Sequence, residues 1–279
     1  MKDLTITNVR VIDLRFPTSR EKIGSDAVNE DPDYSAAYCI LETDGDLEGH
    51  GLTFTLGRGT ELCVNALNYL SRAVMGRSLS SITDDFASFV RELTADSQFR
   101  WLGPEKGVIH LAAGALINCV WDLYARVEQK PVWKLLSEME PEQIVRAIDF
   151  RYITDALTPD EALALLKRQS PGKQQRLDLL ERQGYPAYTT SVGWFGFTDD
   201  QVRRLCHDAM AEGWTHFKLK VGGDSKNDIR RARLVRTEIG WTNKLMVDAN
   251  QKWGVDEAIA FVEKYQEYKL QRGSTATTV

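Results

Sequence analysis

The sequence predicts an α/β protein in two parts, an N-terminal α+β domain followed by a parallel sheet of alternating strands and helices. Alternating apolar and polar residues open the chain and then give way to helical periodicity up to about residue 140. Beyond that point, short apolar runs alternate regularly with amphipathic helices, the pattern of parallel βα units. The length of 279 residues also favours two domains over one.

The N-terminal part contains three predicted strands and three predicted helices. The strands are expected at residues 6–16, 35–44 and 49–57, and the helices at 60–74, 85–96 and 107–129. The last helix is apolar around much of its circumference and is expected to be buried. A polar loop at residues 18–34 separates the first two strands. Loops of this length are usually functional or disordered.

The second part is expected to alternate strand and helix. Strands are predicted at 145–153, 186–194, 217–222 and 245–250, and helical segments at 158–184, 199–213, 227–240 and 255–269. One side of the helix at 227–240 carries Ile229, Ala232, Val235 and Ile239. That helix can therefore cover a sheet. The order is compatible with an open doubly wound sheet or with a (β/α)8 barrel.

Composition excludes several classes of partner. The net charge is −5 and no run of Lys or Arg occurs, which argues against nucleic acid and anionic membranes. Four scattered cysteines predict buried, reduced thiols rather than zinc ligands. The N-terminus lacks a signal-peptide core, and no run is judged long enough to span a membrane. A soluble intracellular location follows, cytoplasmic or mitochondrial.

Two pairs of polar residues end neighbouring predicted strands. Lys218 and Lys220 lie at the end of FKLKVG, and Asp248 and Asn250 at the end of LMVDAN. Each pair is spaced i and i+2 and is expected on one face of its strand. Two adjacent ammonium groups should lower each other's pKa, so that one lysine can act as a base. Asp248 offers an oxygen ligand to Mg²⁺. The alternative readings are lysines that extend into solvent and an Asp-Asn turn.

KxK and DxN, separated by one βα unit, resemble the motifs of the enolase superfamily in its mandelate-racemase-like branch. Five stretches look very like L-fuconate dehydratases, and the likeness covers the chain up to about residue 268. They are residues 24–44, 53–61, 100–126, 149–155 and 185–200.

This resemblance implies a fold and a set of roles. Residues 1–142 would be an α+β capping domain, and residues 143–269 the first part of a TIM-type barrel. Lys220 would be the base and Lys218 its electrostatic partner, which also contacts substrate. Asp248, with Asn250 as accessory, would bind Mg²⁺. The capping loop would bind an acid sugar through Gly24, Ser25, Asp26 and Tyr34. The complete form could be a homo-oligomer.

The end of the chain departs from the family. From Leu270 it reads LQRGSTATTV, which is polar and unlike a buried strand. The family's second and third metal-binding carboxylates and its His-Asp acid have no counterpart. The expectation is a truncated, inactive form of a magnesium-dependent L-fuconate dehydratase that binds Mg²⁺ weakly or not at all. The alternative is a non-catalytic fragment that binds a partner or full-length subunit through its exposed barrel edge.

Other motifs carry less weight. Gly57 and Gly59 lack the third glycine of a dinucleotide-binding loop. The four histidines are scattered and are expected to be structural. Trp101 could line the pocket or pack under the cap.

Overall fold

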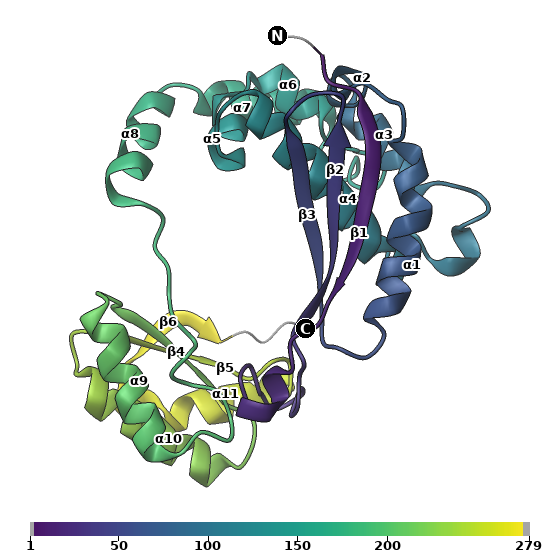
Figure 1. The fold of residues 1–279 in the computed structure, drawn as a ribbon. Coiled ribbons are helices and arrows are strands. Elements are labelled where there is room, and N and C mark those ends of the chain that lie inside the picture. The colour runs from purple at the N-terminus through teal and green to yellow at the C-terminus, as the bar shows by residue number, and fades with distance from the viewer. Residues whose placement is uncertain (1–2, 276–279) are drawn as a thin grey trace. The chain divides into compact units, whose positions relative to one another are not determined.

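The computed structural model describes the main chain of residues 3–275 and the side chains of residues 3–270. The chain forms two compact units (Figure 1). Each unit has its own apolar core. The first unit contains Met1–Arg15 and Ser35–Gly184, and the second contains Phe16–Tyr34 and Tyr185–Val279. The division of the chain at residue 142 stays a prediction.

The first unit is built on an antiparallel sheet in the order β1-β2-β3. Its strands are β1 (Ile6–Leu14), β2 (Ser35–Thr43) and β3 (Glu48–Thr55). The three predicted strands are thus confirmed. Helix α4 (Gly107–Val127) lies so close to β3 that a Cβ atom at Gly51 would overlap the carbonyl oxygen of Ala115. Glycine at this position therefore sets the distance between helix and sheet.

Short helices complete the first unit. They are α1 (Thr60–Leu70), η2 (Ser71–Ala73), α2 (Leu79–Thr83), α3 (Phe86–Thr94), η3 (Arg100–Leu102), α5 (Val132–Glu138), α6 (Pro141–Arg146), α7 (Pro159–Gln169) and α8 (Lys173–Gln183). The predicted helical segments at 60–74, 85–96, 107–129 and 158–184 are confirmed. The prediction of a strand at 145–153 is wrong. Pro141 and a capping box between Glu140 and Gln143 begin α6, and turns follow it.

Helix α4 also corrects the expectation about membrane spans. It has 21 residues and is mostly apolar, so by length and composition alone it could cross a membrane. In the structure, its buried residues join the core of the first unit together with residues of α1 and β2. Helices of this length and composition also occur in the buried cores of proteins that do not span a membrane.

The second unit is a parallel sheet in the order β4-β5-β6 with helices between its strands. Its elements are η1 (Thr18–Glu21), α9 (Asp199–Ala211), β4 (His216–Lys220), α10 (Ser225–Ile239), β5 (Lys244–Asp248), α11 (Val255–Lys264), η4 (Gln266–Tyr268) and β6 (Leu270–Thr275). The predicted βα alternation is confirmed here. Ala232, Val235 and Ile239 of α10 are buried in the core of this unit, as expected from their spacing.

Two further strand predictions are wrong in this unit. Residues 186–194 form no regular strand, although Thr189 makes one parallel bridge to Phe217 of β4. Conversely, the polar stretch from Leu270 to Thr275 is a strand, because its main chain pairs with β5 whatever its side chains are. Residues 276–279, the rest of the predicted polar tail, lie outside the described residues.

The contact between Gly51 and α4 yields a stability prediction. Gly51→Ala should lower the free energy of unfolding by about 2 kcal/mol, because an added methyl group would force helix and sheet apart. The measurement is urea unfolding followed by circular dichroism. Gly114→Ala is the matched control. Nothing lies within 4 Å of a Cβ atom at Gly114, so this variant should be neutral or more stable. Equal losses in both variants would contradict the packing argument.

Candidate active site at the ends of strands β4 and β5

Strands β4 and β5 present their polar residues on one face. Parallel pairing sets Lys218 opposite Met246 and Lys220 opposite Asp248. The alternate residues of both strands are apolar and buried in the core of the unit: Phe217, Leu219, Leu245 and Val247. Because side chains alternate along a strand, burial of these four directs both lysines and Asp248 to the opposite face.

Asp248 is the centre of a cluster at this end of the sheet. Its Oδ2 atom accepts a hydrogen bond from Lys220 Nζ at 2.9 Å and lies 3.0 Å from Lys218 Nζ. Lys220 Nζ also donates to Asn250 Oδ1 at 2.6 Å. Lys218, Lys220, Asp248 and Asn250, hereafter the lysine cluster, are therefore brought together as predicted from the sequence.

Asn250 reaches the cluster by a different route from the one predicted. Strand β5 ends at Asp248, so Asn250 is not on a strand face. It lies in the following turn with φ of 48°, a left-handed conformation that Asn tolerates better than most residues. Its N–H donates to Asp248 Oδ1 at 3.0 Å, which folds the amide side chain back towards Lys220.

Tyr188 is a member of the site that the sequence analysis did not identify. Its hydroxyl oxygen accepts a hydrogen bond from Lys218 Nζ at 3.0 Å, and the same ammonium group lies 4.4 Å from the centre of its ring. Main-chain hydrogen bonds between Thr189 and β4 hold the segment in place. The only signal in the sequence was the position of Tyr188 in the strand-like stretch 186–194.

The electrostatics of the lysine cluster correct another expectation. Burial alone would lower the pKa of Lys218, but the hydrogen bonds to Tyr188 and Asp248 and the charge of Asp248 outweigh burial. The pKa of Lys218 is therefore raised, not lowered by its neighbour as predicted. Burial likewise opposes ionisation of Asp248, yet hydrogen bonds from Lys220, the Asn250 N–H and Lys218 leave its pKa below the usual value.

The predicted substrate loop forms mainly internal contacts. Ser25 and Asp26 are buried, the first donating to the carbonyl of Glu30 and the second accepting the N–H groups of residues 28 and 29. Tyr34 donates its hydroxyl to the carbonyl of Gly24 at 2.8 Å. Gly24 has φ of 81°, and a Cβ atom there would collide with the Tyr34 ring. A role of these four residues in substrate binding stays a prediction.

The same loop is anchored beside the lysine cluster. The N–H of Phe195 donates to the carbonyl of Ser25 at 3.0 Å. Ala27 lies against Gly222, two residues after Lys220, where an added Cβ atom would approach the Ala27 Cβ to 3.2 Å. The loop therefore lies near the ends of the strands that carry the candidate site.

Two residues of the lysine cluster carry oxygen atoms of the type that binds magnesium. Asp248 and Asn250 supply a carboxylate and an amide oxygen, the hard ligands that Mg²⁺ prefers. Among the residues that the structure describes, however, no group of three or more His, Cys, Asp or Glu residues is placed to hold a metal ion. These residues could therefore supply part of a magnesium site, and other oxygen ligands would have to complete it.

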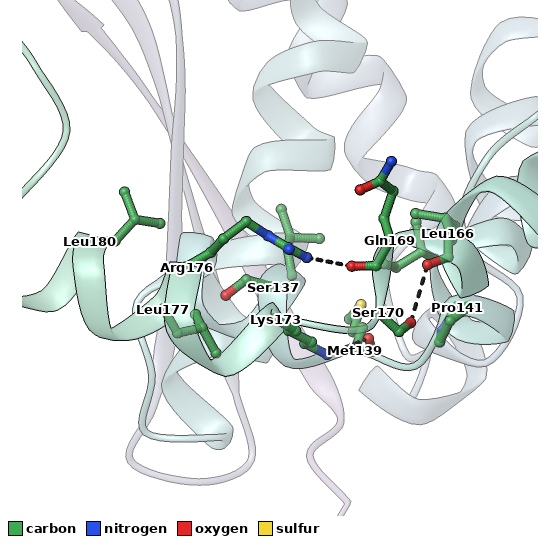
Figure 2. A pocket seen from close by; sticks show the side chains of 12 residues that line it. Ser137, Met139, Pro141, Leu166, Gln169, Ser170, Lys173, Arg176, Leu177 and Leu180 are labelled. Atoms are coloured by element: carbon green, nitrogen blue, oxygen red, sulfur yellow. Dashed lines mark hydrogen bonds between the residues drawn. The ribbon is translucent and has the colours of Figure 1, made fainter.

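A hollow lies in the first unit, among helices α5 to α8. It has a volume of about 300 Å³ and a mainly apolar lining that includes Leu136, Met139, Leu166 and Leu177. Figure 2 shows that two of its polar side chains bond to the main chain, Arg176 to the Gln169 carbonyl and Ser170 to the Leu166 carbonyl. The polar groups of Arg176 and Ser170 are therefore already used in hydrogen bonds to the main chain at the end of α7. The hollow contains no paired acid and base, so it is the weaker candidate.

The remaining sequence candidates are not members of the lysine cluster. Trp101 belongs to the first unit and is exposed. His50 contacts Tyr38 at 3.1 Å, and His207 contacts Glu238 at 2.9 Å, as expected of structural histidines. All four cysteines are buried and free, as predicted.

Comparisons with known proteins match both parts of the chain. Residues 28–137 match the mandelate racemase/muconate lactonizing enzyme N-terminal domain, and residues 201–271 match the enolase C-terminal domain-like family. Mitochondrial enolase superfamily member 1 from Xenopus laevis is 54% identical over 266 residues, which are 95% of this chain and 60% of that protein. L-galactonate dehydratase from Hypocrea jecorina is 52% identical over 272 residues, again 60% of its length.

Solved structures show the same relation. The crystal structure of human mitochondrial enolase superfamily member 1 superposes with a TM-score of 0.91 at 50% identity, covering 96% of this chain and 61% of the human chain. L-talarate dehydratase from Polaromonas, solved with Mg and L-glucarate, has a TM-score of 0.63 at 22% identity over 96% of this chain and 58% of its own, which shows the fold alone. This chain thus spans about 60% of the length of the relatives it matches.

Removing the shared carboxylate should destabilise the chain in a pH-dependent way. The lowered pKa of Asp248 means that its carboxylate stabilises the fold above its unfolded pKa, and that this contribution is lost as pH falls through the native pKa. Asp248→Asn should therefore cost about 2 kcal/mol near pH 7, because two ammonium groups lose their counter-ion. The difference from wild type should shrink below about pH 4.

The measurement is urea unfolding across this pH range. Asp200→Asn is the control, because the ion pair of Asp200 with Arg203 is at the surface and should contribute less than about 1 kcal/mol. In the same Asp248→Asn variant, the pKa of Lys218 should fall. A loss of stability that does not change with pH would argue against the carboxylate as its cause.

Proposed function

The chain belongs to the enolase superfamily, and from that premise we propose that the lysine cluster is part of the active site of a magnesium-dependent acid-sugar dehydratase. The fold consists of an N-terminal capping domain and part of a TIM barrel. One observation carries the proposal: two lysines of β4 meet a carboxylate of β5 within 3.0 Å at the ends of parallel strands, where barrel enzymes place their catalytic groups.

Lys220 is the proposed base. Its amine is held by Asp248 and Asn250, and its side chain is largely buried. Abstraction of the proton α to a substrate carboxylate requires a fixed base and nearby positive charge, because such protons are very weakly acidic. Lys218 is the proposed source of that charge. Its raised pKa keeps it protonated, and Tyr188 fixes its position.

The reaction would remove water across two adjacent carbons. Lys220 would take the α proton from C2, and loss of hydroxide from C3 would leave an enol that tautomerises to a 2-keto-3-deoxy acid. Magnesium bound through Asp248 and Asn250 would supply positive charge to the substrate carboxylate. The residues that complete the metal site and protonate the leaving hydroxide are not assigned to this chain, which spans about 60% of the length of its relatives.

L-fuconate is the proposed substrate, and 2-keto-3-deoxy-L-fuconate its product. The name of the Hypocrea relative supports this choice, since L-fuconate is L-galactonate without its C6 hydroxyl group. The two acids share their configuration at C2 and C3, where the reaction takes place. An intracellular location is proposed with it, and the names of the Xenopus and human relatives support a mitochondrial one.

We also propose that the polypeptide of residues 1–279 does not dehydrate L-fuconate when assayed alone. One carboxylate does not replace the several oxygen ligands that Mg²⁺ requires. Asp256 and Glu257 are poor substitutes, because they lie in the first turn of α11 and not at the end of a strand.

A chimera tests the proposed base. Residues 1–269 would be joined to the part of the Hypocrea dehydratase that this chain does not cover, and formation of keto acid from L-fuconate would be measured with Mg²⁺. The chimera should be active, and Lys220→Ala should lower kcat by about 10³-fold. Lys226→Ala, an exposed lysine of α10, should leave kcat unchanged. An active Lys220→Ala chimera would remove the base assignment, and turnover by residues 1–279 alone would disprove their inactivity.

The same chimera tests the substrate. L-fuconate should be preferred to L-galactonate in kcat/KM by up to about 100-fold, since a pocket that fits a methyl group rejects an added hydroxyl only modestly. Steady-state kinetics with both acids measures this ratio. The complete Hypocrea dehydratase is the reference, and a chimera whose ratio does not differ from that of the reference would contradict the assignment of L-fuconate, but not the proposed chemistry.

A further inference from the structure

Two buried charges on α10 lie beneath the main chain that carries Lys220. Asp228 is 1% exposed and Arg231 is 6% exposed, one helical turn apart. Their charged groups lie 3.7 Å from each other. Burying a charge is costly unless hydrogen bonds and a counter-charge compensate for it. The hydrogen-bond partners of Asp228 and Arg231 therefore show which parts of the structure the two buried charges hold in place.

Arg231 binds three carbonyl groups at the end of the sheet. Its Nη1 donates to the carbonyl of Lys220 at 2.8 Å, and its Nη2 donates to those of Gly193 and Trp194, each at 2.8 Å. The guanidinium also lies 4.8 Å from the centre of the Phe195 ring. Arg231 thus joins the last residue of β4 to the neighbouring segment 193–195.

Asp228 holds the turn that follows. Its Oδ2 atom accepts hydrogen bonds from the N–H groups of Gly222 at 2.8 Å and Gly223 at 3.0 Å. Gly222 has φ of 100°, a conformation that suits glycine. The carboxylate therefore fixes the turn immediately after the Lys220 peptide.

The main chain of Lys220 is held on both sides. Its N–H donates to the Gly193 carbonyl at 3.0 Å, and its own carbonyl accepts from Arg231. We infer that Asp228 and Arg231 are positioning residues that keep the Lys220 amine in the geometry its proposed role requires. This inference rests on the proposed function of Lys220 as base. Neither side chain has a hydrogen bond to the Lys220 amine itself, so both act through the main chain.

Arg236 provides a matched control on the same helix. It is 3% exposed and also donates to main-chain carbonyls, including those of Gly240, Asn243 and Tyr268. These carbonyls lie near the end of α10 and before β5 and β6, away from the ends of the strands that carry the lysine cluster. Loss of Arg236 should therefore destabilise the fold in the same way as loss of Arg231, without touching Lys220.

The test follows the Lys220 amine directly in the chain labelled with ¹⁵N-lysine. The Nζ resonances are recorded by NMR, and Lys220→Arg identifies the Lys220 signal by its loss. In Arg231→Met the Lys220 resonance should shift or broaden beyond its linewidth, whereas in Arg236→Met it should stay in place. Thermal unfolding of both variants should show comparable losses of stability.

An unchanged Lys220 resonance in folded Arg231→Met would overturn the inference, and so would equal changes in both variants. Should Arg231→Met fail to fold, Asp228→Asn and Arg231→Lys decide the question. Each keeps the shape of its site and removes some of the hydrogen bonds, so a smaller shift of the same resonance is expected, and none would overturn the inference. The NMR measurement does not depend on catalytic activity. If the Lys220→Ala chimera is inactive and the Lys220 resonance of Arg231→Met stays in place, only the positioning inference is refuted. If the Lys220→Ala chimera is active and that resonance moves, only the assignment of Lys220 as the base is refuted.

Discussion

Burial of four apolar side chains on β4 and β5 determines how the candidate site is presented. Phe217, Leu219, Leu245 and Val247 are almost fully removed from water. Each contributes about 1.5–3 kcal/mol when buried. A shift of either strand by one residue would expose these side chains and turn a lysine or Asp248 into the core, which is far more costly. Burial of these four side chains therefore fixes both the register of the sheet and the face on which the lysine cluster lies.

This constraint gathers positive charge in a chain whose net charge is −5. Two ammonium groups share one carboxylate, so the lysine cluster carries an excess of one positive charge when all three groups are ionised. Such a local field suits an anionic substrate, which the overall charge would otherwise repel. The two lysines differ in their second partner. Lys218 bonds to the hydroxyl of Tyr188, whereas Lys220 bonds to the side-chain amide of Asn250.

Helix α10 links the stability of the sheet to the geometry of the site. Its apolar face, with Ala232, Val235 and Ile239, packs in the core of the second unit. The first part of the same helix supplies Asp228 and Arg231 to the peptides around Lys220. A single element thus excludes water from one face of the sheet and fixes the main chain at its end. Changes in the packing of α10 would be transmitted to Lys220 through these peptides.

The sequence alone determined the parts set by local periodicity. These were the three N-terminal strands, the βα alternation from residue 199, and the convergence of Lys218, Lys220 and Asp248, because strand alternation and parallel pairing follow from spacing. Tertiary structure decided what spacing does not encode. Residues 145–153 form the end of the capped helix α6 and the turns after it instead of a strand. The polar residues of β6 form a strand because their main chain pairs with β5. Hydrogen bonds to Tyr188 and Asp248 and the charge of Asp248 outweigh burial and raise the pKa of Lys218, whereas the spacing of the two lysines predicted a lowered pKa. The bonds of Tyr188 to Lys218 and of Arg231 to Gly193 join residues that are remote in sequence, so they depend on distances in space that local spacing does not encode.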